Sequence, residues 1–190
     1  MQLNKIEMEN FRQYSGKHKI EFSNGEKNIT LVLGENNAGK TGIYRALLFG
    51  LYGDRILAQD SSSRNIHLVN LKALSDNDLV KARVKIFVSH NKGEYIISRS
   101  LKAINNNGKY LEDQNDELVL DFIDLSGEYH KDYIGDREDI QAAINKMLDE
   151  NIKEFFLFDG EKIETLARAG VESRKEVKNG IIKLMEIDKL

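Results

Sequence analysis

The sequence GENNAGKT at positions 34–41 constrains the fold more than any other feature of this chain, because it has the spacing G-x-x-x-x-G-K-[ST]. The run KNITLVLG, at 27–34, precedes it, and its short apolar character predicts a buried central strand. The stretch TGIYRALLFGLYG, at 41–53, follows and is apolar almost all round, which predicts a buried helix ended by Gly53 in a left-handed cap. Strand, glycine-bearing loop and helix in this order predict an α/β fold around a phosphate-binding loop.

The residue types in this loop suit a nucleoside triphosphate with magnesium. Glycines let consecutive backbone N–H groups curl around the β-phosphate, and Asn37 tolerates the left-handed region better than most residues. Lys40 reaches the β- and γ-phosphates, and the Thr41 hydroxyl ligates Mg²⁺. Asn36 either contacts the γ-phosphate side or caps the turn. The predicted cofactors are ATP and Mg²⁺, bound by Gly34, Asn36, Asn37, Ala38, Gly39, Lys40, Thr41 and Gly42.

Gly42 departs from a common form of this loop. Many such loops carry a second hydroxyl residue at this position, next to the Thr41 hydroxyl. Because glycine has no side chain, one contact to the α-phosphate is expected to be missing.

Periodicity and turn residues predict the other main elements. Residues 3–11 and 18–22 indicate strands around a turn at Gly16, and 81–90 with 94–103 indicate a hairpin that turns near 91–93. Asp136 is placed to cap a helix with apolar residues at i, i+3, i+4, i+7 and i+8. That apolar face consists of Ile140, Ala143, Ile144, Met147 and Leu148.

Four further segments complete the expected secondary structure. Residues 54–76 are polar and predict a long loop, and 105–116 are rich in turn residues. Residues 118–125 predict a strand, and the apolar run EFFLF, at 154–158, predicts a buried strand.

Charge is unevenly distributed along the chain. Its net charge is −3, but residues 111–139 carry −9 and the rest of the chain carries +6. The acidic segment is expected to be a solvated hairpin surface, and the basic remainder leaves room for a nucleic-acid face. Cysteine is absent, and no apolar run approaches the roughly 20 residues of a membrane helix, so a cytoplasmic protein without a membrane partner is expected.

The stretch EFFLFDGEKI, at 154–163, can be interpreted in two ways, the second of which follows from the family resemblance described below. In the first, Asp159 is the metal-binding acid of a complete ATPase, Glu161 activates water, and LSGE at 125–128 begins a signature motif. Against this, no apolar periodicity follows LSGE until Ile140, and Gly160 separates the two acids. LSGE is therefore predicted to be a turn after a strand.

Four segments together carry a family resemblance: KIEMENFRQYSGKHKIEF, GENNAGKT, ALLFGLYGDR and FFLFDGEKIETLA. They resemble the N-terminal ATPase lobe of the SMC-like ATPases, including SbcC-type repair proteins and, most closely, the DndD type of DNA phosphorothioation systems. The resemblance implies an ABC-type P-loop lobe at 1–170, with a mixed sheet around the P-loop helix and a hairpin-rich region. A C-terminal helix at 171–190 would then be the root of a coiled coil.

In this family the ATPase is split between two lobes. The resemblance implies that Asp159 stands in the Q-loop, where the usual glutamine contacts Mg²⁺ and the attacking water. Lys40 and Asp159 would thus be catalytic, and Thr41 and Asp159 metal-binding. Arg12 matches an NFR motif that lies near the nucleotide in related ATPases, although a plain surface arginine is an equal alternative. The signature, Walker B and switch histidine would belong to a C-terminal lobe beyond the coiled coil.

The resemblance also implies partners. ATP would bind between two heads and drive their dimerisation, and the heads would act on duplex DNA with a nuclease or DNA-modification enzyme. Lysines and arginines at two places are candidates for DNA contact, although scattered cations are more often solvated. The candidates are Lys85, Arg99, Lys102 and Lys109, and near the coiled-coil root Arg168, Arg174, Lys175 and Lys178.

Two alternatives remain open at this point. One is a self-contained, ATP-switched binding module in which Asp159 is a true Walker B acid. The other is the ATPase head of a nuclease of the overcoming-lysogenization-defect (OLD) type, because GENNAGKT also suits that family.

Overall fold

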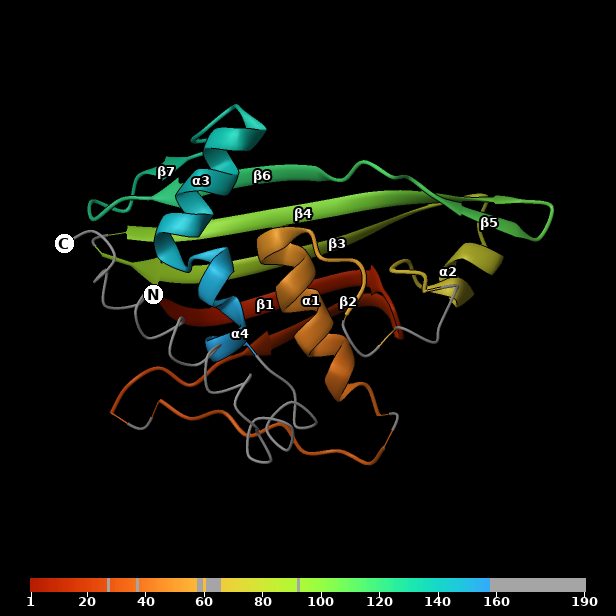
Figure 1. The fold of residues 1–190 in the computed structure, drawn as a ribbon, viewed down its shortest axis with the longest axis horizontal. Helices are drawn as coiled ribbons and strands as arrows, with labels where there is room; N and C mark the ends of the chain where they lie inside the picture. Colours follow the sequence, from red (N-terminus) through yellow and green to blue (C-terminus); the bar gives the residue numbers. More distant parts are fainter. Residues whose placement is uncertain (27, 37, 58–59, 61–65, 92, 158–190) are drawn as a thin grey trace, which may run out of the picture. The chain divides into compact units, whose positions relative to one another are not determined.

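A computed structural model of the chain describes residues 1–157, apart from 27, 37, 58, 59, 61–65 and 92 (Figure 1). The chain divides into two compact units, Met1–Ala143 and Ile144–Leu190. The described part of the first unit is a sheet with helices, as predicted for an α/β fold. Asn37, Asp159 and the expected coiled-coil root at 171–190 lie outside the described residues.

Among the described residues of the first unit, seven strands form one sheet, in the order β2-β1-β3-β4-β6-β7, with β5 paired to β4. All pairs of described strands are antiparallel. The strands are β1 (Gln2–Phe11), β2 (Tyr14–Glu21), β3 (Leu79–His90), β4 (Gly93–Asn106), β5 (Lys109–Glu112), β6 (Glu117–Ile123) and β7 (Tyr129–His130).

The predicted hairpin is confirmed as β3 and β4, which pair along their length with Ile86 opposite Ile97. Alternate residues point to opposite faces, so one face of this hairpin is apolar and buried while Lys81, Arg83 and Lys85 lie on the other. The strand predicted at 118–125 is likewise confirmed as β6.

The helix after the phosphate-loop motif is confirmed as α1 (Lys40–Tyr52), which lies across β1, β3 and β4 (Figure 1). Its inner side packs on the apolar face of the sheet, where the rings of Phe11 and Phe49 stack with centroids 5.6 Å apart. Gly53 ends the helix with φ of 80°, and its N–H donates to the Phe49 carbonyl at 2.8 Å. This is the left-handed cap that the sequence predicts.

The first turn of the chain lies at Arg12–Gln13 and not at Gly16, so that prediction is wrong. Asn10 and Arg12 adopt left-handed conformations at the end of β1, with φ of 48° and 52°. The N–H of Gly16 donates to Oδ1 of Asn10 at 2.8 Å, so the glycine is an irregularity within β2.

The apolar run before the phosphate loop is not the buried central strand that the sequence predicts. Residues 28–34 have no strand assignment, and Leu31 and Leu33 are 76% and 81% exposed. An apolar run becomes a buried strand only when strands flank it and layers cover it. The described strands pair with one another without including this run.

Two predicted loops contain short elements. Within 54–76, Asn70 caps the helix α2 (Leu71–Ser75), and its side chain accepts from the Ala73 N–H at 2.8 Å. Within 105–116, β5 adds a short strand next to β4. Both were missed because each element is only four or five residues long, too short for a periodic signal.

The acidic segment at 111–139 is only partly a solvated surface. Asp121 is buried, and its carboxylate accepts from the Tyr129 hydroxyl at 2.7 Å and from the Asp132 N–H at 3.0 Å. The hydrogen bond that the Tyr129 hydroxyl donates to Asp121 raises the pKa of Tyr129 to about 12. Burial of such acids is possible because hydrogen-bond donors surround them.

The helix predicted after Asp136 is confirmed as α3 (Arg137–Met147), which runs across the boundary between the two units. Oδ1 of Asp136 accepts from the Glu138 N–H at 2.8 Å, as expected of a cap. Among the described residues, no helix combines the length and apolar character needed to span a bilayer.

In the second unit, the strand predicted at 154–158 is wrong where the structure describes it. A 3₁₀ turn, η2 (Glu150–Ile152), leads into the helix α4 (Lys153–Phe156). Asp149 starts this helical course, because its side chain accepts from the Asn151 N–H at 2.7 Å. Residues 158–163 of the EFFLFDGEKI stretch lie outside the described part of the chain.

Candidate functional site

The phosphate-loop motif lies at the N-terminus of α1, where Lys40 folds back over the loop. Its Nζ donates to the carbonyl oxygens of Gly34 and Glu35 at 2.6 and 2.7 Å. Gly39 precedes the helix with φ of 106°, a conformation that a residue with a side chain rarely adopts. The loop therefore holds an ammonium group beside a helix N-terminus, which favours an anion.

The other predicted loop residues have different degrees of exposure. Gly34, Asn36 and Ala38 are exposed, as is Thr41 in the first turn of α1. Gly39 and Gly42 are buried.

The β1–β2 turn contributes Tyr14 and also Gln13, which the sequence did not single out for this place. Nε2 of Gln13 and the hydroxyl of Tyr14 each donate to the carbonyl of Gly39 at 3.0 Å. Burial raises the pKa of the Tyr14 hydroxyl, so it remains a neutral donor. The segment NFRQY could have indicated this contact, because it contains the turn. The sequence prediction placed the turn at Gly16 instead.

Arg12, from the same turn, is directed elsewhere. Its Nη1 donates to the His67 carbonyl at 3.0 Å, and its own carbonyl accepts from the Asn70 side chain at 2.6 Å. Burial and the nearby charge of Arg45 lower the pKa of Arg12, while Asp60 and Glu112 oppose them. Arg12 thus fastens the turn to the segment that leads into α2.

A buried ion pair supports the middle of α1. Nη1 and Nη2 of Arg45 donate to the two carboxylate oxygens of Asp60 at 2.6 and 2.7 Å, and the Leu57 N–H donates to the same carboxylate at 2.7 Å. The hydrogen bond from Arg45 lowers the pKa of Asp60. This bidentate pair fixes the loop after α1 to the helix itself.

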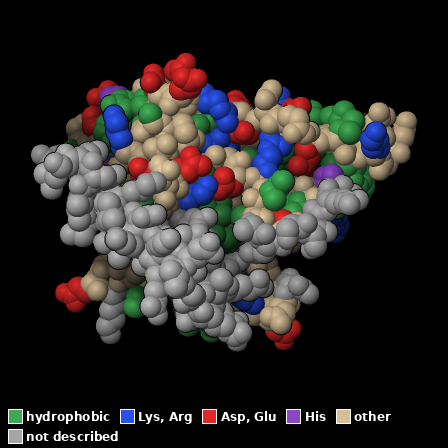
Figure 2. All heavy atoms as spheres, in the orientation of Figure 1, with side chains coloured by type: hydrophobic (Ala, Val, Ile, Leu, Met, Phe, Trp, Pro, Cys, Tyr) green, Lys and Arg blue, Asp and Glu red, His purple; other side chains and the backbone are tan. Residues whose placement is uncertain are grey.

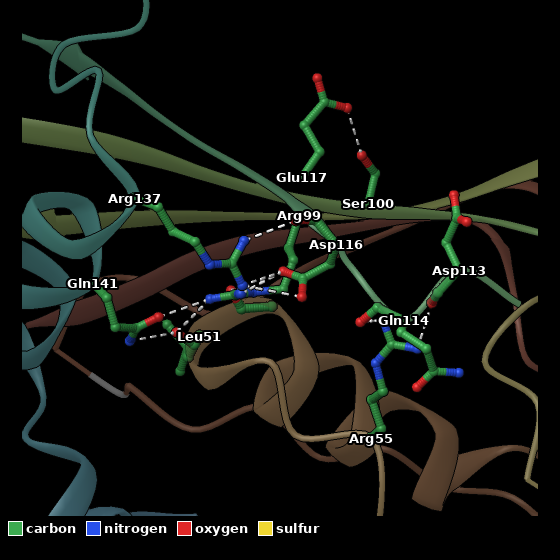
Figure 3. Close-up of polar contacts among 11 residues, drawn as sticks. Leu51, Arg55, Arg99, Ser100, Asp113, Gln114, Asp116, Glu117, Arg137 and Gln141 are labelled. Atoms are coloured by element: carbon green, nitrogen blue, oxygen red, sulfur yellow. Dashed lines mark hydrogen bonds and ion pairs between the residues drawn. The ribbon is translucent and has the colours of Figure 1, made fainter.

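A second polar cluster holds the C-terminal end of α1 (Figure 3). Nε and Nη2 of Arg99 each donate at 3.3 Å, to the carbonyls of Gly50 and Leu51 respectively. Its Nη1 donates to Asp116 at 2.6 Å and its Nη2 to Gln141 at 2.8 Å. A cation among the last carbonyls of a helix complements the negative end of the helix dipole.

Arg99 is therefore not a surface residue for DNA, and that candidate assignment is wrong. It lies at an inward position of β4 and is 1% exposed. Burial alone would raise the pKa of Asp116, but the hydrogen bonds and charges of Arg99 and Arg137 lower it below its usual value. The three groups form a compensated ionic cluster that a purely apolar pattern could not reveal.

The outer face of β2, β1 and β3 carries an open groove of about 460 Å³. Arg83 donates to Glu9 at 2.6 Å, and Lys17 lies 3.9 Å from the same carboxylate. Its charged lining residues are Glu7, Glu9, Lys17, Lys19, Arg83 and Lys85. Figure 2, drawn in the orientation of Figure 1, shows acidic and basic side chains of the described residues interspersed on the face toward the viewer.

The signature-like LSGE is a turn between β6 and β7, as predicted. Oδ1 of Asp124 accepts from the N–H groups of Ser126 and Glu128 at 2.8 and 3.0 Å. A signature motif must open a helix toward phosphate, whereas this turn opens onto a strand. Among the described residues, LSGE therefore does not begin a helix, although the interpretation of this chain as a self-contained ATPase requires a signature helix there.

Comparison with known proteins gives three findings. Residues 5–190 match the AAA domain family. A solved structure from work on ATP-driven dimerization and DNA-stimulated activation of SMC ATPases is similar in fold, with a TM-score of 0.59 and 21% identity over 95% of this chain and 99% of that chain. Arcadin-4 of Pyrobaculum calidifontis is 28% identical over 68 residues, which cover 36% of this chain and 8% of that relative.

Proposed function

This chain belongs to the AAA domain family, and we propose that it is the ATP-binding N-terminal half of an SMC-like ATPase head. The observation that carries the proposal is the Lys40 ammonium held over the loop, 2.6 and 2.7 Å from two loop carbonyls, beside the N-terminus of α1. When ATP binds, the β- and γ-phosphates take the place of those carbonyls as partners of Lys40. The SMC ATPase fold supports the same assignment.

Three side chains divide the chemistry in this proposal. Lys40 neutralises charge on the transferred phosphoryl group, and the Thr41 hydroxyl ligates Mg²⁺. Asp159, in the Q-loop position, contacts the metal or the attacking water. Mg²⁺ supplies Lewis-acid stabilisation of the phosphates when it is bound.

The exposed apolar run at 29–33 supports a split head. Leu31 and Leu33 lie directly before the phosphate loop, yet both project into solvent. Exposed aliphatic side chains in sequence mark a surface that another protein covers. The C-terminal lobe of the same protein is our proposed occupant, because the family resemblance assigns the Walker B motif of the head to that lobe.

We further propose that ATP drives two such heads together, as in the work on SMC ATPases to which the similar structure belongs. DNA is the proposed substrate, in phosphorothioation-linked modification or restriction, or in repair, with a nuclease or modification enzyme as partner. The outer-face groove offers Lys85 and Lys19 to a phosphate backbone, although Glu7 and Glu9 reduce its net charge.

Titration of residues 1–190 with ATP and Mg²⁺ in a calorimeter should give saturable binding with little steady-state hydrolysis. Binding needs the phosphate loop, whereas hydrolysis also needs the groups that the C-terminal lobe supplies. Absence of binding would overturn the proposed function. Robust turnover by this chain alone would favour the self-contained module in which Asp159 acts as a Walker B acid.

Replacing Leu31 and Leu33 together with aspartate should weaken association with the separately produced C-terminal lobe about tenfold or more, because buried leucine area would be lost. The melting temperature of the chain itself should change little, since both side chains are exposed. Sedimentation or calorimetry of the mixture measures the association. Leu79→Asp, at another exposed leucine, is the matched control. Unchanged association in the double variant would rule out this run as the contact.

A further inference from the structure

The side chain of Gln13 covers the first turn of α1 directly above Gly42. An added Cβ on Gly42 would collide with Nε2 of Gln13 and lie 2.8 Å from its Cδ and Oε1. A Cβ on Gly39 would lie 2.7 Å from the same nitrogen. The amide of Gln13 therefore occupies the space that a side chain at position 42 would fill.

This space has a chemical meaning in a phosphate loop. The position after Thr41 often carries a hydroxyl residue, and the backbone of the loop and the first helical turn lies against the α- and β-phosphates. Here Gly42 supplies no side-chain donor. The side-chain amide of Gln13, from the β1–β2 turn, lies where that donor would be.

The hydrogen bond from the Gln13 amide to the Gly39 carbonyl can break without leaving that carbonyl unpaired. The carbonyl of Gly39 receives four donors: Gln13 Nε2 and Tyr14 Oη, each at 3.0 Å, and the N–H groups of Gly42 and Ile43 at 2.8 and 3.3 Å. A carbonyl oxygen has two lone pairs, so four donors compete for it. Gln13 can leave while the helix bonds and Tyr14 satisfy the carbonyl.

Of the three residues around this turn, Gln13 alone combines exposure with a place over the helix N-terminus. The guanidinium of Arg12 is bound to the His67 carbonyl, and Tyr14 is half-buried. Gln13 is exposed and carries two amide hydrogens, so one can turn toward a ligand.

We propose that Gln13 is a nucleotide-binding residue whose amide donates to a non-bridging oxygen of the α-phosphate, in place of the hydroxyl residue that Gly42 lacks. The proposal rests on ATP binding at this loop. Gln13 and Gly42 act as a pair, since the amide reaches the helix only because position 42 has no side chain. A donor to a charged phosphate oxygen is stronger than the present bond to a neutral carbonyl, so ATP draws the amide away from Gly39.

Gln13→Ala should raise the dissociation constant for ATP about tenfold, the usual effect of removing one hydrogen bond to a charged group. The Sp and Rp isomers of adenosine 5′-O-(1-thiotriphosphate) locate the contact, because each replaces one non-bridging α-oxygen by sulfur, a weaker acceptor. The wild-type chain should discriminate between the isomers, and Gln13→Ala should reduce that preference. Gln114→Ala, at an exposed glutamine away from the loop, should leave both quantities unchanged.

Gly42→Ala provides a reciprocal test. Its methyl group would displace the flexible amide of Gln13, so it should weaken ATP binding in the wild-type background and add nothing to Gln13→Ala. Gly42→Ser combined with Gln13→Ala should restore binding, because the hydroxyl supplies the missing donor.

Three results would overturn the assignment of Gln13. They are an unchanged ATP affinity in Gln13→Ala, weaker binding with an undiminished isomer preference, and additive effects of Gln13→Ala and Gly42→Ala. Each is distinct from failure of the proposed function, in which the wild-type chain itself would bind no ATP.

Discussion

Replacing Lys40 with alanine should raise the dissociation constant of the chain for ATP about a hundredfold or more, the upper range for a charge-assisted contact. The ammonium of Lys40 is the one side-chain cation that bonds to the loop carbonyls in the described structure, at Gly34 and Glu35. Without it, the β- and γ-phosphates would face the loop with backbone donors alone. Calorimetry with ATP and Mg²⁺ measures the change.

The Lys40 variant should remain folded. Lys40 is exposed and its two bonds are at the surface, so its loss should alter the free energy of unfolding by no more than about 1 kcal/mol. Lys72→Ala, at another exposed lysine, is the matched control and should bind ATP as wild type does. Equal affinity in the Lys40 variant and in wild type would remove the loop as the nucleotide site.

The elements that the sequence predicted correctly are those whose burial depends on their own pattern. α1 is apolar almost all round and is followed by a glycine in the left-handed cap, so its extent needs no knowledge of other segments. The β3–β4 hairpin is likewise local, with alternating residues on either side of a short turn. α3 adds a capping aspartate to a five-residue apolar spacing.

The errors share a dependence on distant partners. The run at 29–33 is as apolar as a central strand, but the strands that would flank it are not among those that the structure describes. The turn at Arg12–Gln13 depends on a positive φ at two non-glycine residues, Asn10 and Arg12. Sequence composition instead favours the positive φ at the nearby Gly16, because glycine adopts it most readily. The resulting position of Gln13 over Gly42 joins residues 29 positions apart, so no local pattern could predict it.

Arg99 illustrates the same limit within a confirmed strand. In EYIISRSLKA the alternation places Arg99 on the apolar side with Ile97 and Leu101, and this pattern disagrees with its charge. Asp116, Arg137 and Gln141 resolve the conflict, and all three come from later in the chain. The charge suggested a surface residue, but the alternation correctly identified the buried face.

Arg99→Met should lower the free energy of unfolding by about 3 to 5 kcal/mol, the range for breaking a buried ion pair on one side. Methionine fills much of the space but donates no hydrogen bond, so the carbonyls of Gly50 and Leu51 and the carboxylate of Asp116 lose their buried partner. Urea unfolding followed by circular dichroism measures the loss. Arg83→Met is the matched control, because Arg83 pairs with Glu9 on the partly exposed outer face and should cost about 1 kcal/mol or less.

A second substitution separates the lost charge balance from lost packing. Arg99→Met combined with Asp116→Leu should recover much of the stability, since an apolar pair avoids a buried carboxylate that keeps only the half-exposed Arg137 as its cation. Acid gives an independent readout: the folded-state pKa of Asp116 is lowered, so its stabilisation is present above the unfolded value and is lost as pH falls through the folded value. The deficit of the Arg99→Met variant should therefore narrow in acid. A cost no larger than that of Arg83→Met, or a double variant weaker than Arg99→Met alone, would show that the cluster does not hold the end of α1.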